Sequence, residues 1–490
     1  MGNRGARAGL PTVIRTIRAL KPVQVLWRIR RVLLGRAWKL APDFFAERLE
    51  RSARQLRPFL WEASYLKSYA EFRRRRASHR ESQADQVLEG QFTLASRQYE
   101  FGGEIDWTRA DVRCERPLAG FELHYQGYLE DLALAWRQTG QRRYLDRWKG
   151  LISSWICENP PEGGEFSWSP YVIAERARNW ISSCYWVQDE LDGDFKHLFE
   201  RSLSRQIAFL SRNLEWDLQA NHLLQNMCGL ATASAFFGGF HGRTLRQKAL
   251  SMLAGEARRQ VLGDGMHEER SVHYHMKAML DFLEVLLLAR DGAFPSGEAD
   301  PEGICQLEEV LGRMGGVLAS TYETIGDLPL MNDSEEMAGS KVIWSIRETG
   351  GRCELRRPTS EQSQRGSGYL TGNVGPWSAV FDAGLAGPPH QLGHAHADHL
   401  SFELWHEGKK LICDSGNLTY RPGDDRQYSR STSAHNTVRI DGEDSLETWA
   451  AFRMGRRPTR HVAGILEQGD ERIRWFGQHE QCQLPGTGEA

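Results

Sequence analysis

The sequence lacks long apolar runs. Its 490 residues contain no stretch of about 18 or more uninterrupted apolar side chains, so no membrane-spanning helix is expected. The longest candidate, residues 227–240, is interrupted by threonine and serine and has the length of a core helix. The start of the chain also lacks a short apolar block followed by a small-residue cleavage site, so no secretory signal is predicted.

An excess of charge of either sign is also missing. The chain has 62 Lys and Arg against 64 Asp and Glu, a formal charge of -2. This balance argues against a polycation that coats nucleic acid. Hydrophobic residues make up 40% and charged residues 26%, which is a globular composition. A chain of this length is expected to form two or more domains.

Paired cysteines are absent as well. The eight cysteines are widely scattered and none forms a CxxC pair. This pattern indicates mostly free, buried thiols and excludes a disulfide framework or a zinc knuckle as the organising feature. Cysteine usage therefore favours a reducing compartment.

The N-terminal segment, residues 1–45, contains no acidic residue before Asp43. Ten Arg and Lys lie within its first 40 positions, and residues 13–20 have an amphipathic pattern. We weigh two interpretations: a solvated helix that packs on its own domain, which we favour, and a basic amphipathic helix that contacts an anionic membrane surface.

Helical spacing dominates the sequence from about residue 10 to about residue 350. Apolar residues recur three or four positions apart, as in 199–214, which carries Phe199, Leu203, Ile207, Leu210 and Leu214. No clean repeat of fixed length is present. The pattern predicts successive helix–loop–helix units over 46–355, arranged as a bundle or a toroid.

The pattern changes after Gly350. Residues 356–368 are polar and predict a linker, and beyond them apolar residues alternate. We expect strands over 400–405 and 410–414 joined by a turn at 407–408, and a further strand over 435–440 followed by an Asp-Gly turn. Helices followed by strands, without alternation of the two, predict a helical domain and then an antiparallel β domain at 369–490.

Histidine is concentrated in two places. Of 16 histidines, three lie between His267 and His275 and five between His390 and His406. Histidine is a common metal ligand and carries protons near neutral pH, so both clusters are candidate functional sites.

The C-terminal cluster reads HAHADH from position 394 to 399. In an extended segment alternate side chains share a face, so His394 and His396 point the same way. Asp414 ends one predicted strand and His435 begins another. Two imidazoles and a carboxylate from neighbouring strands would form a three-ligand zinc site. The alternative is that these polar side chains cap loops and bond to one another.

The same six residues match the HxHxDH ligand signature of the metallo-β-lactamase superfamily. That fold places the motif early and needs further ligands over a long downstream stretch, whereas here the motif follows most of the chain. A metal-dependent hydrolase is therefore the less favoured alternative.

The first cluster places Tyr274 between His273 and His275 at the start of a predicted helix. Such a tyrosine could transfer protons, but its ordinary pKa of about 10 requires nearby positive charge before it can act as a base. Arg270, a histidine or a metal ion could supply that charge. The alternative is a partly buried tyrosine with a satisfied hydroxyl group.

A third polar segment, 219–226, precedes a small-residue helix. If this segment is helical, His222 and Asn226 share a face. Amides such as that of Asn221 can bind a carboxylate or a sugar hydroxyl without adding charge. The alternative is a solvated polar face or a buried, satisfied amide.

Taken in their order along the chain, these three segments resemble the heparinase II/III-like polysaccharide lyases and the related alginate and oligoalginate lyases. The matching stretches read NHLLQN, ERSVHYH, HAHADHLSF and RSTSAHNTV, and start at Asn221, Glu269, His394 and Arg430. Each motif is weak by itself, but four in the same order are fairly specific. The resemblance covers most of the chain.

The resemblance implies an incomplete (α/α) toroid followed by an antiparallel β-sandwich, truncated here relative to the family's usual length. It implies β-elimination on an anionic, uronic-acid-containing polysaccharide such as a glycosaminoglycan. Asn221, with His222, would neutralise the substrate carboxylate. Tyr274 would be the base, and His394 would assist it.

The resemblance also implies ligand and substrate contacts. His396, Asp414 and His435 match the family's metal ligands, and the ion, expected to be Zn²⁺, would be structural because elimination needs no activated water. The expected substrate contacts are Arg176, Asn226, Arg270 and His275.

The sequence and the resemblance favour different cellular locations. The sequence favours a cytoplasmic or membrane-peripheral protein, whereas the resemblance favours the periplasm. The alternative to a lyase is a non-catalytic protein that binds polysaccharide or acts in its assembly.

Overall fold

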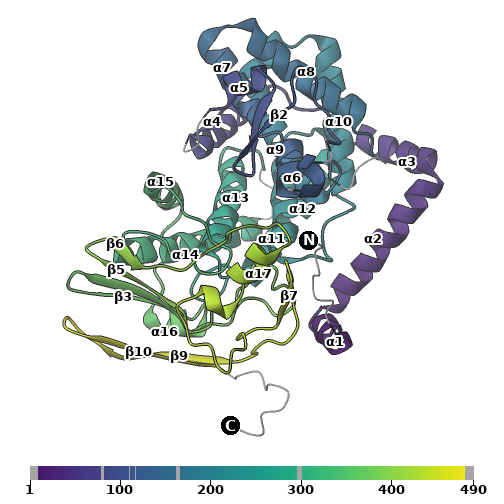
Figure 1. Cartoon of the computed structure of the whole chain (residues 1–490). Coiled ribbons are helices and arrows are strands. Elements are labelled where there is room, and N and C mark those ends of the chain that lie inside the picture. The colour runs from purple at the N-terminus through teal and green to yellow at the C-terminus, as the bar shows by residue number, and fades with distance from the viewer. Residues whose placement is uncertain are drawn as a thin grey trace. The chain divides into compact units, whose positions relative to one another are not determined.

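The computed structural model describes residues 9–78, 82–109, 111–115, 117–161, 166–294 and 301–479. The chain divides into two compact units that interleave in sequence (Figure 1). Unit 1 comprises residues 1–25, 256–280 and 306–490, and unit 2 comprises residues 26–255 and 281–305. Helices precede strands along the chain, as the sequence predicts. The exact domain bounds of 1–45, 46–355 and 369–490 stay a prediction.

Unit 2 is almost entirely helical. Its elements are α2 (Pro22–Leu40), α3 (Pro42–Arg54), α4 (Leu66–Ala77), α5 (Ala84–Leu88), β1 (Gln91–Leu94), β2 (Arg97–Glu100), η1 (Asp111–Glu115), α6 (Pro117–Tyr125), α7 (Tyr128–Thr139), α8 (Arg142–Glu158), α9 (Pro170–Val187), η2 (Gln188–Glu190), α10 (Gly193–Leu210), α11 (Ala220–Ser234), α12 (Gly239–Gln260), the end of α13 (Val272–Arg290) and the start of α14 (Pro301–Ile325). Helices α2, α12, α13 and α14 extend into unit 1. The short antiparallel hairpin β1–β2 is not predicted by the helical periodicity.

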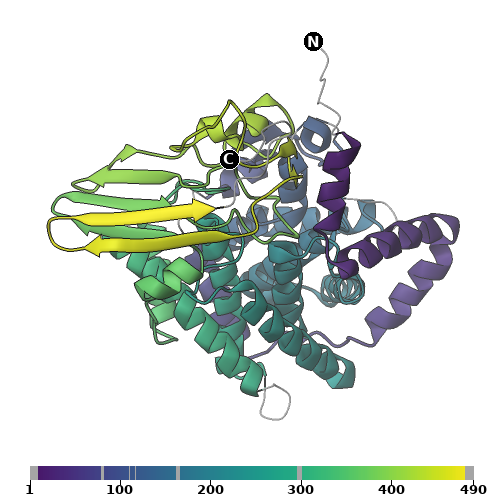
Figure 2. The ribbon, with the colours of Figure 1, turned by 90° about the horizontal axis from the view of Figure 1, so that it is seen from below.

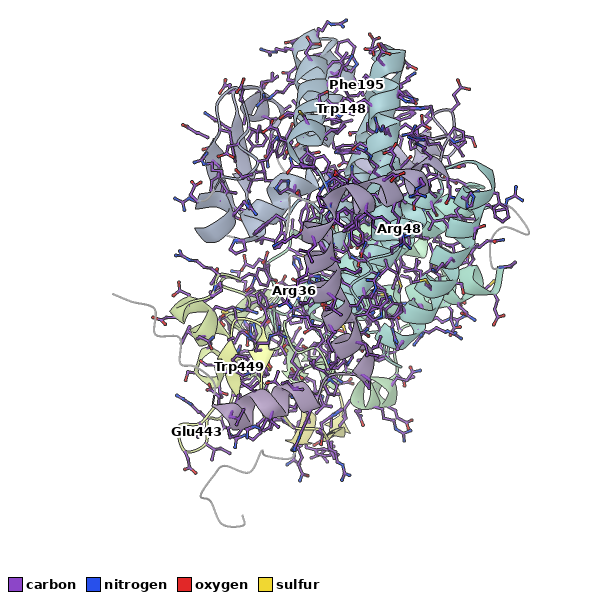
Figure 3. The ribbon with its side chains drawn as sticks, turned by 90° about the vertical axis from the view of Figure 1, so that its right-hand side faces the viewer. Arg36, Arg48, Trp148, Phe195, Glu443 and Trp449 are labelled. Atoms are coloured by element: carbon purple, nitrogen blue, oxygen red, sulfur yellow. The ribbon has the colours of Figure 1, made fainter. Side chains whose placement is uncertain are left out.

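Helix α9 lies at the centre of unit 2 and contacts α4, α6, α7, α10 and α11. Aromatic side chains fill the space between these helices. Trp180 of α9 lies 5.6 Å from Trp155 between ring centroids, and Trp148 lies 5.6 Å from Phe195 (Figure 3). These three tryptophans are therefore packing residues, which bury large apolar surfaces.

A buried ionic network also holds unit 2 together. Arg73 on α4 donates to Glu130 at 3.3 Å and to Glu284 at 3.2 Å, and only 8% of Arg73 is exposed. Arg178 on α9 donates to Asp281 at 2.9 Å. Because charges away from water need partners, each of these helices depends on the others for its buried charge.

Unit 1 contains all of the longer strands. Its elements are α1 (Leu10–Arg18), the start of α13 (Val272–Arg290), most of α14 (Pro301–Ile325), α15 (Gly339–Gly350), α16 (Ser360–Arg365), β3 (Tyr369–Val374), β4 (Trp377–Asp382), β5 (Phe402–His406), β6 (Lys409–Ile412), α17 (Asp424–Ser429), η3 (Thr432–Ala434), β7 (Thr448–Ala450), β8 (Arg453–Met454), β9 (His461–Gln468) and β10 (Ile473–His479).

The strands form a two-layered arrangement within unit 1. Strands β3, β4, β5 and β6 form an antiparallel sheet in sequence order, and β9 pairs with β10 as a separate hairpin. The hairpin stacks on the sheet (Figure 2), and Trp475 lies parallel to Phe381 with ring centroids 6.2 Å apart. The turn at Glu407-Gly408 has positive φ at both residues, 50° and 73°, as a tight hairpin requires.

One predicted strand is wrong. Residues 435–439 form no strand, and only Ile440 makes an isolated bridge, to Glu443. The predicted turn is right, because Asp441 and Gly442 both have positive φ. The segment is attached by side chains instead of a backbone ladder: the Asn436 amide donates to the carbonyls of Phe402 and Cys413, at 3.0 Å each.

Three smaller expectations have different outcomes. The predicted linker 356–368 contains α16, which begins with a capping box at Thr359. Among the described residues, no helix is both long and apolar enough to cross a bilayer. Free thiols are confirmed at six cysteines, but half of them are exposed, not buried; the exposed ones are Cys157, Cys305 and Cys413.

We predict that Arg73→Met lowers the free energy of unfolding by about 3 kcal/mol or more, because it leaves the buried Glu130 without its cation and removes one of the cations that pair with Glu284. Chemical denaturation measures this loss. The matched control is Arg74→Met on the same helix, whose partner Glu71 is exposed. That variant should lose less than about 1 kcal/mol. Equal losses in the two variants would contradict a stabilising role for the buried network.

Candidate active site and metal group

Tyr274 is positioned by the start of α13. Ser271 precedes the helix, and its hydroxyl accepts from the backbone N–H of Tyr274 at 3.3 Å, which satisfies one of the free amides of the first turn. The same hydroxyl donates to the carbonyl of Asp333 at 2.7 Å. Arg270, two residues before the helix, has φ +54°. This strained turn and the serine cap fix the helix start against the loop that carries Asp333.

The Tyr274 hydroxyl contacts a second tyrosine. Its oxygen lies 3.0 Å from that of Tyr420. Burial, with the negative charge of Asp333 adding to it, raises the pKa of Tyr420 well above the ordinary value. Tyr420 therefore stays protonated and can donate a hydrogen bond to the Tyr274 oxygen. The ring of His394 lies against Tyr274, with centroids 4.0 Å apart.

Asp333 links the two histidines of the HAHADH motif. One carboxylate oxygen lies 2.8 Å from Nδ1 of His394 and the other lies 2.9 Å from Nε2 of His396. An ionised carboxylate only accepts hydrogen bonds, so each of these ring nitrogens carries a proton. In a neutral ring the opposite nitrogen then has a free lone pair: Nε2 in His394 and Nδ1 in His396.

Arg426 on α17 keeps Asp333 ionised. Its guanidinium pairs with both carboxylate oxygens, one of them at 2.8 Å from Nη2. Burial by itself would raise the pKa of Asp333, but Arg426 and the hydrogen bonds from His394 and His396 hold it well below its usual range. Both Asp333 and Arg426 are fully buried. A bidentate pair of this kind is the geometry in which arginine binds carboxylate most strongly.

The loop after α14 and the loop of the histidine motif are joined at several points. The side-chain oxygen of Asn332 accepts from the backbone of His396 at 2.9 Å, and the backbone of Asp333 donates to the carbonyl of His394 at 3.0 Å. Arg430 donates to the carbonyls of Ala395 and Leu392, at 3.0 Å each. These bonds hold the motif in a fixed conformation although it is not in a strand.

His396, Asp414 and His435 form a candidate metal group. All three residues are buried, and their donor atoms lie within 4.8 Å of one another. Nδ1 of His396 and Nε2 of His435 are buried with no hydrogen-bond partner in the described part of the chain. Burial lowers the pKa of His396 to about 4, against the opposing bond to Asp333, so its ring is neutral near pH 7. Burial would lower the pKa of His435 as well, but the hydrogen bond and charge of Asp414 raise it. Two unpartnered imidazole nitrogens beside a carboxylate fit a metal ion.

The Asn221 segment lies in unit 2, at the start of α11. The two residues before it have positive φ, 65° at Gln219 and 47° at Ala220, an uncommon conformation for non-glycine residues. His222 lies 3.5 Å from a carboxylate oxygen of Glu215, and its ring lies 5.0 Å from that of Tyr171. About a third of the His222 side chain is exposed, at 34%. This strained helix start presents a partly exposed imidazole close to a carboxylate.

Two of the predicted substrate contacts in unit 2 are interior residues. Arg176 is fully buried, donates to Gln206 at 2.8 Å and lies 3.8 Å above the ring of Trp155. Asn226 exchanges two hydrogen bonds with Glu215, at 2.8 and 2.9 Å. We therefore assign Arg176 to packing, and Asn226 to holding Glu215 beside His222.

The two predicted substrate contacts in unit 1 are also buried. Arg270 is 6% exposed and donates to the carbonyls of Leu385 and Gly366. His275 is 1% exposed, and its Nε2 lies 3.1 Å from the carbonyl of Met314. Both side chains point into the fold because they satisfy backbone groups there, and we assign them structural roles.

Four residues of this arrangement are missed by sequence reasoning: Asn332, Asp333, Tyr420 and Arg426. A sequence signal exists for two of them, because Asn332-Asp333-Ser334 is a polar run directly after the apolar residues 328–331. Tyr420 and Arg426 lie in ordinary polar surroundings. No pattern in a single sequence marks them, because their roles come from distant contacts. Arg426 pairs with a residue 93 positions away, and Tyr420 contacts one 146 positions away.

Two family models match the chain. The model described as Heparinase II/III N-terminus matches residues 43–347, and the one described as Heparinase II/III-like, C-terminal matches residues 356–481. A heparin-sulfate lyase of Bacteroides stercoris is 24% identical over 425 residues, which are 76% of this chain and 61% of that protein. The heparin-sulfate lyase of Pedobacter heparinus is 24% identical over 382 residues, covering 72% and 56%.

A relative with a different name also matches. The FtsZ-localized protein C of Caulobacter vibrioides is 23% identical over 376 residues, covering 75% of this chain and 59% of that protein. The matches to these relatives thus span a little more than half of each relative's length.

Solved structures agree in fold. The crystal structure of heparinase III has a TM-score of 0.63 at 19% identity, covering 89% of this chain and 71% of that one. A heparan sulfate lyase from Pedobacter heparinus has a TM-score of 0.52 at 20% identity, covering 86% and 70%. These likenesses confirm the predicted incomplete (α/α) toroid followed by an antiparallel β-sandwich.

The metallo-β-lactamase alternative is wrong. Of the motif residues, only His396 belongs to the metal group found among the described residues, whereas His394 faces Tyr274. The N-terminal family model alone spans more than half of the 490 residues and the C-terminal model covers most of the remainder. The chain belongs to the heparinase II/III family.

Proposed function

We propose that the chain is a polysaccharide lyase that cleaves a uronic-acid-containing polysaccharide by β-elimination. The observation that carries this proposal is the contact of the Tyr274 hydroxyl with the protonated Tyr420 hydroxyl, beside the ring of His394. Membership of the heparinase II/III family supports the same reaction class.

The reaction requires a base and no added water. The base takes the proton at C5 of the uronic acid, and the C5–H electrons form a double bond to C4. The bond from C4 to the linking oxygen then breaks, and that oxygen takes a proton as it leaves. The products are a new reducing end and an unsaturated uronic acid, so atoms and charge balance.

Tyr274 is the proposed base. A phenolate needs stabilisation, and the hydrogen bond that the neutral Tyr420 can donate supplies part of it. After C5 deprotonation Tyr274 carries the proton, which it can return to the leaving oxygen as a general acid. One tyrosine can thus perform both proton transfers when the two substrate atoms lie on the same side of the ring.

His394 is the proposed assistant. Asp333 holds its Nδ1–H, so the Nε2 lone pair is directed away from that carboxylate. In this tautomer His394 can accept the proton of Tyr274 or of a substrate hydroxyl. Its contact with the Tyr274 ring, at an interplanar angle of 40°, limits the orientations in which it does so.

Asn221, with His222, is the proposed neutralising group for the substrate carboxylate. Negative charge grows on that carboxylate as C5 loses its proton, and preorganised hydrogen-bond donors stabilise such charge most effectively. The strained backbone before Asn221 supports a constrained role, and Glu215 orients His222 at 3.5 Å. Asn226 contributes by holding Glu215.

A glycosaminoglycan of the heparan sulfate type is the proposed substrate class. This rests on the relatives named heparin-sulfate lyase, at 24% identity. The second candidate is a non-catalytic protein that binds polysaccharide or acts in its assembly. One relative, FtsZ-localized protein C, has a name that states no lyase activity.

The metal group is proposed to bind Zn²⁺ in a structural role. His396, Asp414 and His435 offer the two-imidazole, one-carboxylate set that zinc accepts. When bound, the ion would fix the loops that carry these residues. Asp333 supports His396 from the far side of its ring, which is the usual arrangement for a metal-binding histidine.

We predict that Tyr274→Phe lowers the rate of unsaturated product formation by about 10²-fold to 10⁴-fold, because it removes the proton-transfer group. Ultraviolet absorbance of the new C4–C5 double bond on heparan sulfate, hyaluronan and alginate measures this rate. The unfolding midpoint should stay unchanged. Near-normal turnover by the variant would contradict the assignment of the base.

Two controls accompany this test. Tyr428→Phe alters a tyrosine that is 53% exposed and should turn over like the unmodified protein. Tyr420→Phe removes the hydrogen bond but not the base. Its rate of product formation should therefore lie between the rates of Tyr274→Phe and of the unmodified protein. If the unmodified protein binds a polysaccharide tightly but yields no unsaturated product on any of them, the lyase proposal is wrong and the binding function is favoured.

We predict that His396→Ala abolishes binding of Zn²⁺, which should be present at about one ion per chain in the unmodified protein. Elemental analysis after dialysis measures the metal content. The matched control is His399→Ala in the same motif, whose Nδ1 lies 3.1 Å from the Ser445 hydroxyl. Equal zinc content in both variants would show that the ligand set is wrong.

A further inference from the structure

We propose that helix α2 binds the surface of an anionic lipid bilayer, lying in the plane of the interface. The proposal concerns residues 26–40, which belong to unit 2. It is independent of the lyase proposal, because none of these residues belongs to the candidate active site or the metal group.

One face of α2 is anchored to unit 2. The ring of Trp27 lies 6.3 Å from that of Trp216, and Trp38 stacks on Phe45 with centroids 5.2 Å apart. Asp217 pairs with Arg28 at 3.0 Å and also with Arg31. The helix is therefore held by its own unit along one side only.

The opposite face is apolar and uncovered. Leu26, Ile29, Leu33 and Leu40 follow at steps of three, four and seven, which places them on one side of a helix. Their exposed fractions are 66%, 51%, 57% and 86%. Isolated exposed apolar residues are ordinary, but a row along a helix marks a surface that meets another apolar phase.

The positive charge of the N-terminal residues favours an anionic partner. No acidic residue occurs before Asp43, and the exposed Arg36 and Lys39 lie among the apolar residues of α2 (Figure 3 labels Arg36). Long basic side chains can extend to lipid phosphates while their stems and the neighbouring apolar residues enter the acyl boundary. An anionic bilayer satisfies both features at once.

A second copy of the chain fits this face less well. Two α2 helices paired through their apolar rows would bring Arg36 and Lys39 of each copy close to the cations of the other. Like charges in contact oppose association, and no acidic side chain within residues 1–42 compensates them. The charge pattern therefore favours lipid over self-association.

Helix α1, which belongs to unit 1, has the same design. Thr12 donates to Glu447 at 2.6 Å and Arg15 donates to Glu447 at 3.0 Å, so that side of α1 is anchored to its own unit. Leu10 and Ile17 on the other side are 73% and 55% exposed. Two successive helices thus each have one anchored side and one uncovered apolar side.

The experiment is flotation of the full chain with two kinds of vesicle, phosphatidylcholine alone and phosphatidylcholine mixed with phosphatidylglycerol. We expect the protein to float with the anionic vesicles and to stay at the bottom with the neutral ones. Leu33→Glu should weaken the association with anionic vesicles at least about tenfold. Arg36→Gln/Lys39→Gln should weaken it about fivefold for each residue.

The matched control is Phe240→Glu, which places the same charge at another apolar residue of unit 2 that is 72% exposed. It should float like the unmodified protein. Circular dichroism confirms that each variant is folded, since all altered side chains are exposed.

Three results would overturn the proposal. The protein could fail to float with either vesicle, or float equally with both, or Leu33→Glu could float as well as Phe240→Glu. Analytical ultracentrifugation adds a further decisive outcome: a dimer that Leu33→Glu converts to a monomer would show that a second copy covers this face.

Discussion

The buried ion pair of Asp333 and Arg426 is the interaction on which the candidate site depends. Arg426 keeps the carboxylate ionised inside the fold, and the ionised carboxylate then accepts from both His394 and His396. A neutral Asp333 would have to donate at one of these contacts, and a tautomer would change. Buried pairs of this kind are more informative about specificity than about stability, because desolvation offsets much of their attraction.

Asp333 contacts both the proposed proton-transfer group, through His394, and the candidate metal group, through His396. His394 lies against Tyr274, and His396 belongs to the group with Asp414 and His435. In the proposed function, the HAHADH motif therefore gives its first two histidines different roles, whereas a hydrolase motif would place both on one ion. We infer that the metal acts on the reaction only through the loop that it fixes.

The sequence predicts the order of helices and strands, because periodicity is a local signal, and its density of histidines points to the segment that carries His396. The roles of the metal group and of Tyr274 stay predictions. The sequence fails where side chains replace backbone pairing, as at Asn436, whose amide bonds hold a segment expected to be a strand. It also does not reveal that Arg176 and Arg270 are buried, because an arginine that donates to buried carbonyls looks the same in sequence as one that binds an anion. Asp333 is missed because its partners lie 61 to 93 positions away.

The most direct test of this account is Asp333→Asn, measured for zinc content and for elimination rate in the same preparation. The amide keeps the shape of the carboxylate but cannot accept from both histidines and Arg426 together. The account predicts that zinc content and rate fall together while circular dichroism reports a folded chain. A folded variant that keeps its zinc and its rate would contradict the account, as would one that loses neither property more than a His399→Ala control.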